Sequence, residues 1–374
     1  MNIGIIIKDY AAGKQFSKNG VPMKSGAEFH AENHALQLMR LGHKVTIMAK
    51  KRYWFTKARE NINGIDLVRL HAPFRWLEIV IRLFTTHRGI DTFYILGHPP
   101  FAVWAILYAR LFHKRTVLAL TGKAEIFRQS SWRNRVLTKC DHYIALSQEI
   151  HDSLITETGI FPGKISILGQ GISTERFSTV TDKEKNILRQ KHGFAAEDIV
   201  LLFCARIVEN KGIKTIMEIW PKLHNEFPTG KLLIAGGGQK DLIVQLERLS
   251  ENNNNSVIMV GEIGDPKEYY QLSDIYILPS HHEGLPTTLM EAMSCGLPSV
   301  VSDIGGCRDL IQHDIHGYLC KVNDSDSFYD YTRKLFLSPD ERRNFGKNAT
   351  SFVRKHLDYK MVIPKLENIL QQDR

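Results

Sequence analysis

The sequence of 374 residues lacks several patterns that would by themselves assign a function. Its five cysteines are scattered without a Cys-x-x-Cys spacing, which argues against a structural metal site or a disulfide framework and favours reduced thiols in the cytosol. The sequence has no zinc-finger, RNP or helix-turn-helix pattern, so we do not expect nucleic acid as a partner. It also has no Gly-x-Gly-x-x-Gly, and the dinucleotide-binding fingerprint is therefore absent.

Long apolar runs are missing as well. The most apolar stretch, residues 101–109, ends at Arg110, whereas a helix that spans a bilayer needs roughly 20 apolar residues. The first apolar run meets Lys8 and Asp9 too early for a signal peptide and is typical of a buried strand. We therefore expect a cytoplasmic protein that does not cross a membrane.

The composition is that of an ordinary globular protein, with 43% apolar and 24% charged residues. The length exceeds what one hydrophobic core usually organises, so we expect two domains. Residues 1–178 contain 25 Lys and Arg against 13 Asp and Glu, an excess of +12, whereas the rest of the chain carries −3. This asymmetry favours an anionic partner for the first half, such as an anionic membrane surface or an acceptor that bears a diphosphate.

The first half opens with the order of elements that is typical of a Rossmann-like domain. Residues 3–7 suit a buried strand, a polar loop follows, and a helix with apolar positions at helical spacing begins at Gly26. Further along, residues 50–59 interleave basic and aromatic side chains, and residues 75–88 place apolar side chains on one helical face. Two interpretations of these two segments stay open: a peripheral membrane contact, or a solvated loop and an ordinary core-facing helix.

The pattern restarts in the second half at the apolar run 199–203, which indicates a second Rossmann-like domain. Arg206 and Lys211 follow this run at the expected carboxyl end of a strand, and Gly212 begins the next helix. Two fixed cations at such a place can neutralise a diphosphate and stabilise it as it leaves. Taken alone, the same pair also fits a solvated surface loop.

The most informative stretch contains two glutamates eight positions apart. An apolar run at residues 275–278 suits a strand, Glu283 stands in the loop that follows, and Pro286 suits the start of a helix. The backbone amides near Thr287 would then lie at a helix N-terminus, which favours an anion. Because Glu291 would lie about a turn further into this helix, a phosphate at the helix tip would have a carboxylate on each side.

This stretch resembles the E-x7-E signature of the family-4 retaining glycosyltransferases, with the small-residue segment 291–296 and the turn 302–306 in register. Nearly the whole chain can be laid on that family. The resemblance implies an α/β fold of the GT-B type, in which two Rossmann-like, doubly wound domains face a cleft. It implies an acceptor-side domain of residues 1–177, a nucleotide-sugar-binding domain of residues 178–351, and a C-terminal helix of about 352–374 that crosses back to the first domain.

The resemblance also assigns roles to residues. It implies that Arg206, Lys211 and Glu283 are catalytic. His98 is a further candidate from its position, because it ends the strand before Thr121 in a loop of similar orientation. The residues that it implies in donor binding are Gly26, Ile263, Gly284, Leu285, Thr287, Thr288 and Glu291. Thr121 and Lys123 fall on the acceptor and sugar side, where many relatives carry a histidine that this chain lacks. Whether Thr121 in its place alters activity stays open.

The function implied is transfer of a hexose from a UDP- or GDP-linked donor to an acceptor hydroxyl, with retention of the anomeric configuration. No Asp-x-Asp pair stands where a metal-dependent sugar transferase needs one, so we expect neither a metal nor another cofactor. The acceptor would be a lipid-linked glycan or a saccharide in bacterial surface polysaccharide or lipopolysaccharide biosynthesis, met at the inner face of the plasma membrane. A nucleotide-sugar epimerase of similar fold and a non-catalytic partner subunit are the alternatives.

Overall fold

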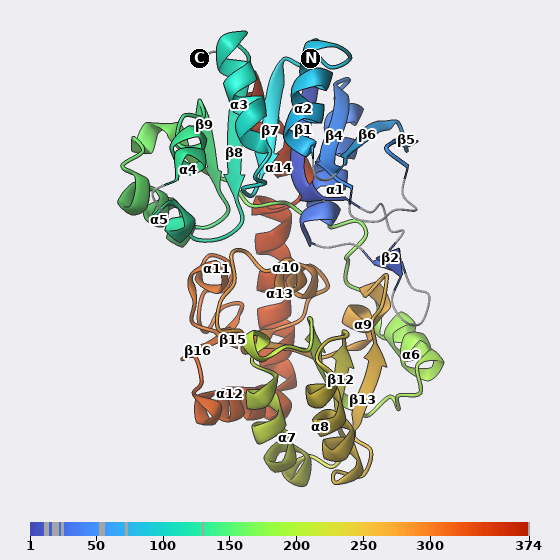
Figure 1. The fold of residues 1–374 in the computed structure, drawn as a ribbon. Coiled ribbons are helices and arrows are strands. Elements are labelled where there is room, and N and C mark those ends of the chain that lie inside the picture. The colour runs from blue at the N-terminus through green and yellow to red at the C-terminus, as the bar shows by residue number, and fades with distance from the viewer. Residues whose placement is uncertain are drawn as a thin grey trace. The chain divides into compact units, whose positions relative to one another are not determined.

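The structure is a computed structural model, and it divides the chain into two compact units, each drawn in Figure 1. Unit 1 comprises Met1–Gly171 and Tyr359–Arg374, and unit 2 comprises Ile172–Asp358. The structure describes residues 1–372 except residues 11–14, 17–21, 24–25, 52–56, 72–73 and 129–130. Most of the polar loop before Gly26 and the centre of the basic and aromatic segment 50–59 therefore lie outside the described residues.

The boundaries between the two units lie a few residues from the domain boundaries expected from the sequence, at 177/178 and 351/352. The ring of Phe177 lies 6.0 Å from that of Tyr270, and its carbonyl oxygen accepts a hydrogen bond from Ser294, so the segment before residue 178 already packs in unit 2. At the other end, the chain forms two helices rather than one. They are α13 (Pro339–His356) and α14 (Tyr359–Gln371), and only α14 belongs to unit 1.

Unit 1 is built on an eight-stranded sheet in the order β10-β9-β8-β7-β1-β4-β6-β5, which is parallel except for the pair β5–β6. Its strands are β1 (Asn2–Asp9), β4 (Lys44–Lys50), β5 (Arg59–Ile62), β6 (Ile65–Leu70), β7 (Thr92–Leu96), β8 (Arg115–Leu120), β9 (His142–Ala145) and β10 (Ile165–Ile167). Its other elements are the short pair β2 (Gln15–Phe16) and β3 (Pro22–Met23), α1 (Gly26–Arg40), α2 (Arg75–Phe84), α3 (Ala102–Leu111), α4 (Trp132–Leu137), α5 (Gln148–Thr158), α14 and the 3-10 turns η1 (Ala124–Arg128) and η2 (Pro162–Lys164).

Helices cover both faces of this sheet, because neighbouring residues of a strand point to opposite faces. On β7, Tyr94 stacks with His34 of α1, whereas Phe93 meets the ring of Tyr108 of α3. Helix α14 lies on the α1 side, where its apolar residues join the same core as β1 and α1. The sheet is therefore doubly wound, and its strands are nearly continuous apolar runs for that reason.

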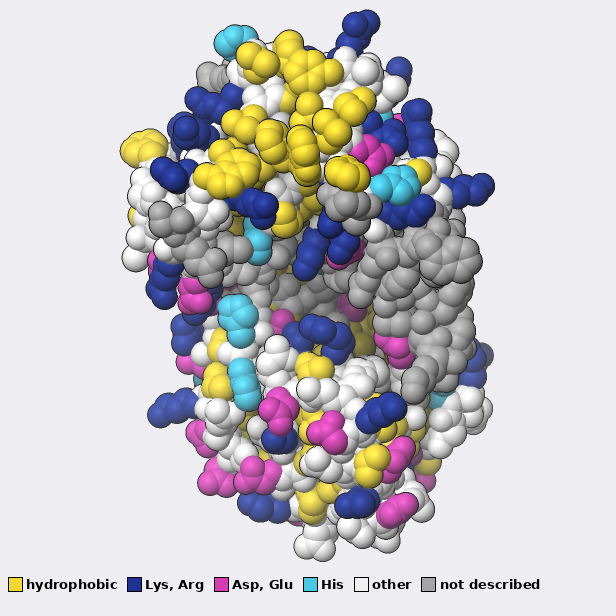
Figure 2. Space-filling view, viewed as in Figure 1, with side chains coloured by type: hydrophobic (Ala, Val, Ile, Leu, Met, Phe, Trp, Pro, Cys, Tyr) yellow, Lys and Arg dark blue, Asp and Glu magenta, His cyan; other side chains and the backbone are white. Residues whose placement is uncertain are grey.

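The outer surface of α2 and α3 is unusually apolar (Figure 2). Ile79 and Leu83 of α2 are buried, as the core-facing interpretation requires, but Trp76, Ile81 and Phe84 are about half exposed. Helix α2 is thus apolar on two faces, and only one of them packs inside unit 1. None of the described helices is both long and apolar enough to cross a membrane.

Unit 2 contains a parallel six-stranded sheet in the order β13-β12-β11-β14-β15-β16. Its strands are β11 (Ile199–Cys204), β12 (Gly230–Ala235), β13 (Val257–Gly261), β14 (Ile275–Leu278), β15 (Ser299–Ser302) and β16 (Gly317–Cys320). Its helices are α6 (Asp182–Lys191), α7 (Ile213–Glu226), α8 (Lys240–Glu251), α9 (Lys267–Leu272), α10 (Thr287–Ser294), α11 (Gly305–Arg308), α12 (Ser325–Leu337) and α13, with a 3-10 turn η3 (Glu209–Lys211).

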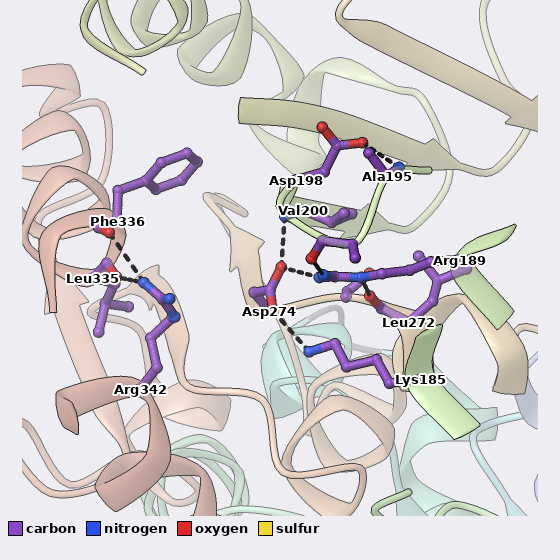
Figure 3. Close-up of polar contacts among 12 residues, drawn as sticks. Lys185, Arg189, Ala195, Asp198, Val200, Leu272, Asp274, Leu335, Phe336 and Arg342 are labelled. Carbon is purple, nitrogen blue, oxygen red and sulfur yellow. Dashed lines mark hydrogen bonds and ion pairs between the residues drawn. The ribbon is translucent and has the colours of Figure 1, made fainter. Parts of the chain in front are cut away.

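One carboxylate ties helix α6 to this sheet (Figure 3). Asp274, directly before β14, accepts from Lys185 Nζ at 2.7 Å and from Arg189 Nη2 at 2.5 Å. It also accepts from the backbone amide of Val200 in β11 at 2.7 Å. The Arg189 side chain is only 6% exposed, so Asp274 supplies the counter-charge for a buried cation.

All five cysteines are buried and unpaired. Burial raises the pKa of each thiol above its ordinary value, because the thiolate would lose its hydration. They therefore behave as small core residues.

Candidate functional site

The strand order of unit 2 reverses between β11 and β14, since β12 and β13 lie to one side and β15 and β16 to the other. Open parallel sheets bind ligands beyond the carboxyl ends of their strands at such a reversal. The segment after β11 carries Arg206 and Lys211, and the loop after β14 carries Glu283. The topology thus brings three of the sequence-predicted residues to the place where this kind of sheet binds ligands.

Lys211 and Glu283 are in direct contact. The Lys211 Nζ lies 2.5 Å from Glu283 Oε1, and the hydroxyl of Ser280 donates to the same oxygen at 2.8 Å. The two charged side chains are 18% and 11% exposed, so the pair is largely withdrawn from water. A pair at this depth retains much of its attraction and holds both side chains in one geometry.

Two glycines let the loops approach closely. Gly212 has a φ of 71°, in the left-handed region, and a Cβ there would lie 1.8 Å from the carbonyl oxygen of Pro279. A Cβ on Gly306 would lie 2.4 Å from the carbonyl oxygen of Gly284. Only glycine fits these contacts. Backbone packing therefore fixes the segment after β11 against the loop after β14, and with it the Lys211–Glu283 pair.

The segment that carries Arg206 is held from its other side by the glycines that follow β12. The backbone amide of Ile207 donates to the carbonyl of Gly237 at 2.8 Å, and a Cβ on Gly236 would lie 1.9 Å from the carbonyl oxygen of Ala205. The Arg206 side chain itself is exposed and makes no hydrogen bond or ion pair with any residue that the structure describes. A fixed backbone with an uncompensated guanidinium is well suited to bind a phosphate.

Glu291 lies on the inner side of α10 and is 6% exposed. The hydroxyl of Tyr270 donates to Glu291 Oε2 at 2.8 Å. Burial raises the pKa of Glu291 to about 7, although the Tyr270 hydrogen bond and the charge of Arg176 partly offset this effect. Its carboxyl group therefore changes charge near neutral pH.

The remaining donor-side candidates of unit 2 lie at the start of α10 and after β13. Gly284 and the buried Leu285 precede α10, whose first residues are Thr287 and Thr288. Ile263 is half-buried and follows β13 by two residues. Gly284 and Leu285 share the loop of Glu283, whereas Ile263 lies after a different strand.

In unit 1 the candidates follow neighbouring strands. His98 follows β7 and Thr121 follows β8, and both side chains are exposed. Partial loss of solvent and, to a lesser degree, the charge of Lys8 lower the pKa of His98. A neutral imidazole at a strand end can accept a proton or a hydrogen bond from a hydroxyl group.

Lys123 and Gly26 have structural explanations beside the functional ones. Lys123 Nζ lies 3.0 Å from Glu149 Oε1 of α5, in a pair that is about one-third exposed on each side. Gly26 is the first residue of α1, and a Cβ at this position would meet no atom within 4 Å. No close approach in the described structure therefore requires glycine there.

Three side chains that position the site carry little or no signal in the sequence. They are Ser280, which binds Glu283, Tyr270, which binds Glu291, and Tyr276, whose hydroxyl donates to Thr288 Oγ1 at 2.8 Å. For Ser280, the only local signal was that it is a polar residue three positions before Glu283. The two tyrosines had none, because their hydroxyl groups act across separate elements.

Residues 184–352 match the family model described as Glycosyl transferases group 1, and residues 24–176 match that of Glycosyltransferase Family 4. The putative glycosyltransferase EpsD of Bacillus subtilis is 32% identical over 183 residues, 49% of this chain and 48% of that protein. The capsular polysaccharide biosynthesis glycosyltransferase CapM of Staphylococcus aureus is 23% identical over 232 residues, 60% of each chain. The chain therefore spans about half the length of a curated relative such as EpsD.

The crystal structure of Anabaena HepE in complex with UDP-glucose superposes with a TM-score of 0.79 at 18% identity and covers 99% of both chains. At this identity the likeness concerns the fold alone. It confirms the α/β fold of the GT-B type, with two Rossmann-like domains, that the resemblance of the sequence implied.

Proposed function

The chain belongs to the family-4 glycosyltransferases, and we propose that it transfers a hexose from a UDP- or GDP-linked donor to an acceptor hydroxyl with retention of configuration. The observation that carries this proposal is the contact of Lys211 with Glu283 at the strand reversal of unit 2, beside the loop of Arg206. The donor diphosphate would meet Arg206 and Lys211, and its ribose hydroxyl groups would meet Glu291.

The chemistry follows from which groups are charged. Arg206 and Lys211 would stabilise the diphosphate as the glycosidic bond breaks, so that the reaction requires no metal ion. Glu283 would be the one carboxylate near the sugar, which disfavours a double displacement by two carboxylates. We therefore favour attack of the acceptor hydroxyl on the face that the diphosphate leaves, with the departing phosphate oxygen accepting the acceptor's proton.

The acceptor side belongs to unit 1 in this proposal, with Thr121, Lys123 and His98 near the transferred sugar and Gly26 near the donor phosphates. The basic first half supports an anionic or lipid-linked acceptor in surface polysaccharide or lipopolysaccharide biosynthesis, at the inner face of the plasma membrane. The likeness to CapM, which is named for capsular polysaccharide biosynthesis, supports the same assignment.

Calorimetric titration with UDP, GDP and ADP tests the donor assignment. We expect one of the three to bind with clear preference, and incubation with the matching nucleotide sugar to release the nucleoside diphosphate only when an acceptor is present. Conversion of the donor alone would indicate an epimerase instead. If none of the three nucleotides binds, the donor site is wrongly assigned.

The raised pKa of Glu291 predicts how donor affinity depends on pH. Ribose hydroxyl groups donate to the ionised carboxylate, so the affinity for a nucleotide sugar should rise as the pH increases through about 7. The free energy of unfolding should instead fall as the pH rises from about 4.5 to about 7, because over this range the folded protein holds a proton that the unfolded chain releases. Glu291→Gln should remove the pH dependence of the affinity.

Tyr270→Phe provides the matched variant for this prediction. In the wild type, the hydrogen bond from Tyr270 lowers the pKa of Glu291. Its loss should therefore move the midpoint of the affinity profile to higher pH. Titrations with a UDP- or GDP-sugar at several pH values check both variants. An unchanged profile in Glu291→Gln would show that another group titrates.

A further inference from the structure

Unit 1 contains a cavity of about 630 Å³ that no part of the donor site uses. Lys8 near the end of β1, Lys50 at the end of β4, and Pro100 and Phe101 in the segment after β7 contribute to its wall. The strand order of unit 1 reverses between β1 and β7, so the cavity lies at the carboxyl ends of strands beside that reversal. This is where an open parallel sheet receives a ligand.

The cavity is strongly cationic. Lys8, Lys50, Arg75 and Arg133 line it, and none of its described lining residues is acidic. Within the described part of the chain, no carboxylate forms an ion pair with any of these four side chains. Four uncompensated charges around one cavity favour an anion that carries more than one negative charge.

Tryptophan forms the rest of the wall. Trp76, Trp104 and Trp132 line the cavity and contact one another in sequence, with ring centroids 5.8 and 6.0 Å apart. Trp76 is 48% exposed and Trp132 46%. Such half-exposed indole rings are typical of the boundary between water and lipid, because the ring is apolar and its N–H is polar.

An exposed apolar surface continues from this wall along α2 and α3. Of the 17 large hydrophobic side chains that are exposed among the described residues, nine lie between residues 74 and 132. The rings of Phe84 and Phe112 are 5.4 Å apart, so the two helices present one continuous surface. Figure 2 shows it as an apolar patch with Lys and Arg side chains around it. A patch of this kind marks an interaction site.

We propose that this cavity binds the diphosphate of a membrane lipid while the exposed surface of α2 and α3 enters the lipid layer. The four cations match the charge of a diphosphate better than that of a phosphodiester headgroup, and the adjoining apolar surface accommodates the hydrocarbon side of the same molecule. That this lipid is the sugar acceptor rests on the proposed function; that it binds here does not.

The charges argue against a second copy of the chain as the occupant. A symmetric contact through α2 and α3 would bring the same cationic cavities of two basic units together, and like charges oppose such a contact. A lipid surface has the required polarity instead, since apolar chains lie beneath an anionic layer.

Co-sedimentation with vesicles tests the proposal. We expect binding to phosphatidylcholine vesicles that contain a polyprenyl diphosphate, weaker binding to vesicles of equal surface charge that contain phosphatidylglycerol, and none to phosphatidylcholine alone. Binding should also change the tryptophan fluorescence, because three of the five tryptophans line the cavity. Soluble pyrophosphate alone should not reproduce the affinity, since it lacks the apolar part.

Two matched pairs of variants locate the site. Lys50→Ala should weaken vesicle binding about fivefold, whereas Lys44→Ala, at the opposite end of the same strand, should not. Ile81→Asn should weaken it roughly tenfold, and Ile187→Asn, an isoleucine of similar exposure on α6, should leave it unchanged.

Equal effects within either pair would overturn the proposal, as would equal binding to the two anionic vesicles. A dimer in analytical ultracentrifugation that Ile81→Asn dissociates would also overturn it in favour of self-association. The same variants should bind nucleoside diphosphates like the wild type. A wild-type protein that binds nucleoside diphosphates but not the polyprenyl diphosphate vesicles would contradict this inference alone, whereas one that binds the vesicles but no nucleotide would contradict the proposed function alone.

Discussion

Lys211→Ala and Arg206→Ala are each expected to lower kcat by about 10²- to 10³-fold, because each removes a cation from the diphosphate as its charge develops. The ammonium of Lys211 is already fixed by Glu283, so little reorganisation is needed when the donor binds. The guanidinium of Arg206 has no counter-charge among the described residues and is available to the phosphate. Steady-state kinetics with saturating donor and acceptor measure the loss.

Lys214→Ala is the control for both variants. Lys214 lies three positions beyond Lys211, is 63% exposed, and pairs with the equally exposed Glu209. Its removal should change kcat by less than about twofold, since exposed pairs contribute little. Circular dichroism should show that all three variants remain folded. Normal turnover in both Arg206→Ala and Lys211→Ala would remove the diphosphate assignment.

Asp274→Ala is expected to lower the free energy of unfolding of unit 2 by about 3–5 kcal/mol. The substitution leaves the nearly buried guanidinium of Arg189 without its carboxylate and removes the acceptor for the backbone amide of Val200. It also frees Lys185, so α6 loses two of its links to the sheet. Urea unfolding followed by circular dichroism measures the change.

Asp303→Ala removes an aspartate from another ion pair with arginine and serves as the control. The Asp303–Arg308 pair also has a separation of 2.5 Å, but its side chains are 40% and 57% exposed. Removing it should cost less than about 1 kcal/mol, because water screens the charges. A similar loss in both variants would mean that burial does not set the contribution of Asp274.

Local pattern was sufficient for the strands of the site and for the residues directly after them. The apolar runs at 199–203 and 275–278 coincide with β11 and β14, because strands buried on both faces need continuous apolar sequence. Once two such strands are parallel neighbours, the loops after them must meet at one edge of the sheet. The approach of Lys211 to Glu283 was therefore predictable, although 72 positions separate them.

Features that depend on contacts between distant segments were not predictable. The break between α13 and α14 accompanies a hydrogen bond from the amide of Ile172 to the carbonyl of Leu357, for which no local signal exists. Likewise, the apolar residues of α2 exceed what one helical face can hold. Only packing decides that Ile79 faces the sheet and Ile81 faces outwards.

The burial of all five thiols makes this protein a convenient host for site-selective labelling. A cysteine introduced at an exposed position, such as Phe161 in unit 1 or Leu337 in unit 2, would be the only readily reactive one of its chain. Two of them together would carry a pair of dyes without prior removal of native cysteines. Energy transfer between the dyes could then follow, in single molecules, how the separation of the two units responds to each substrate.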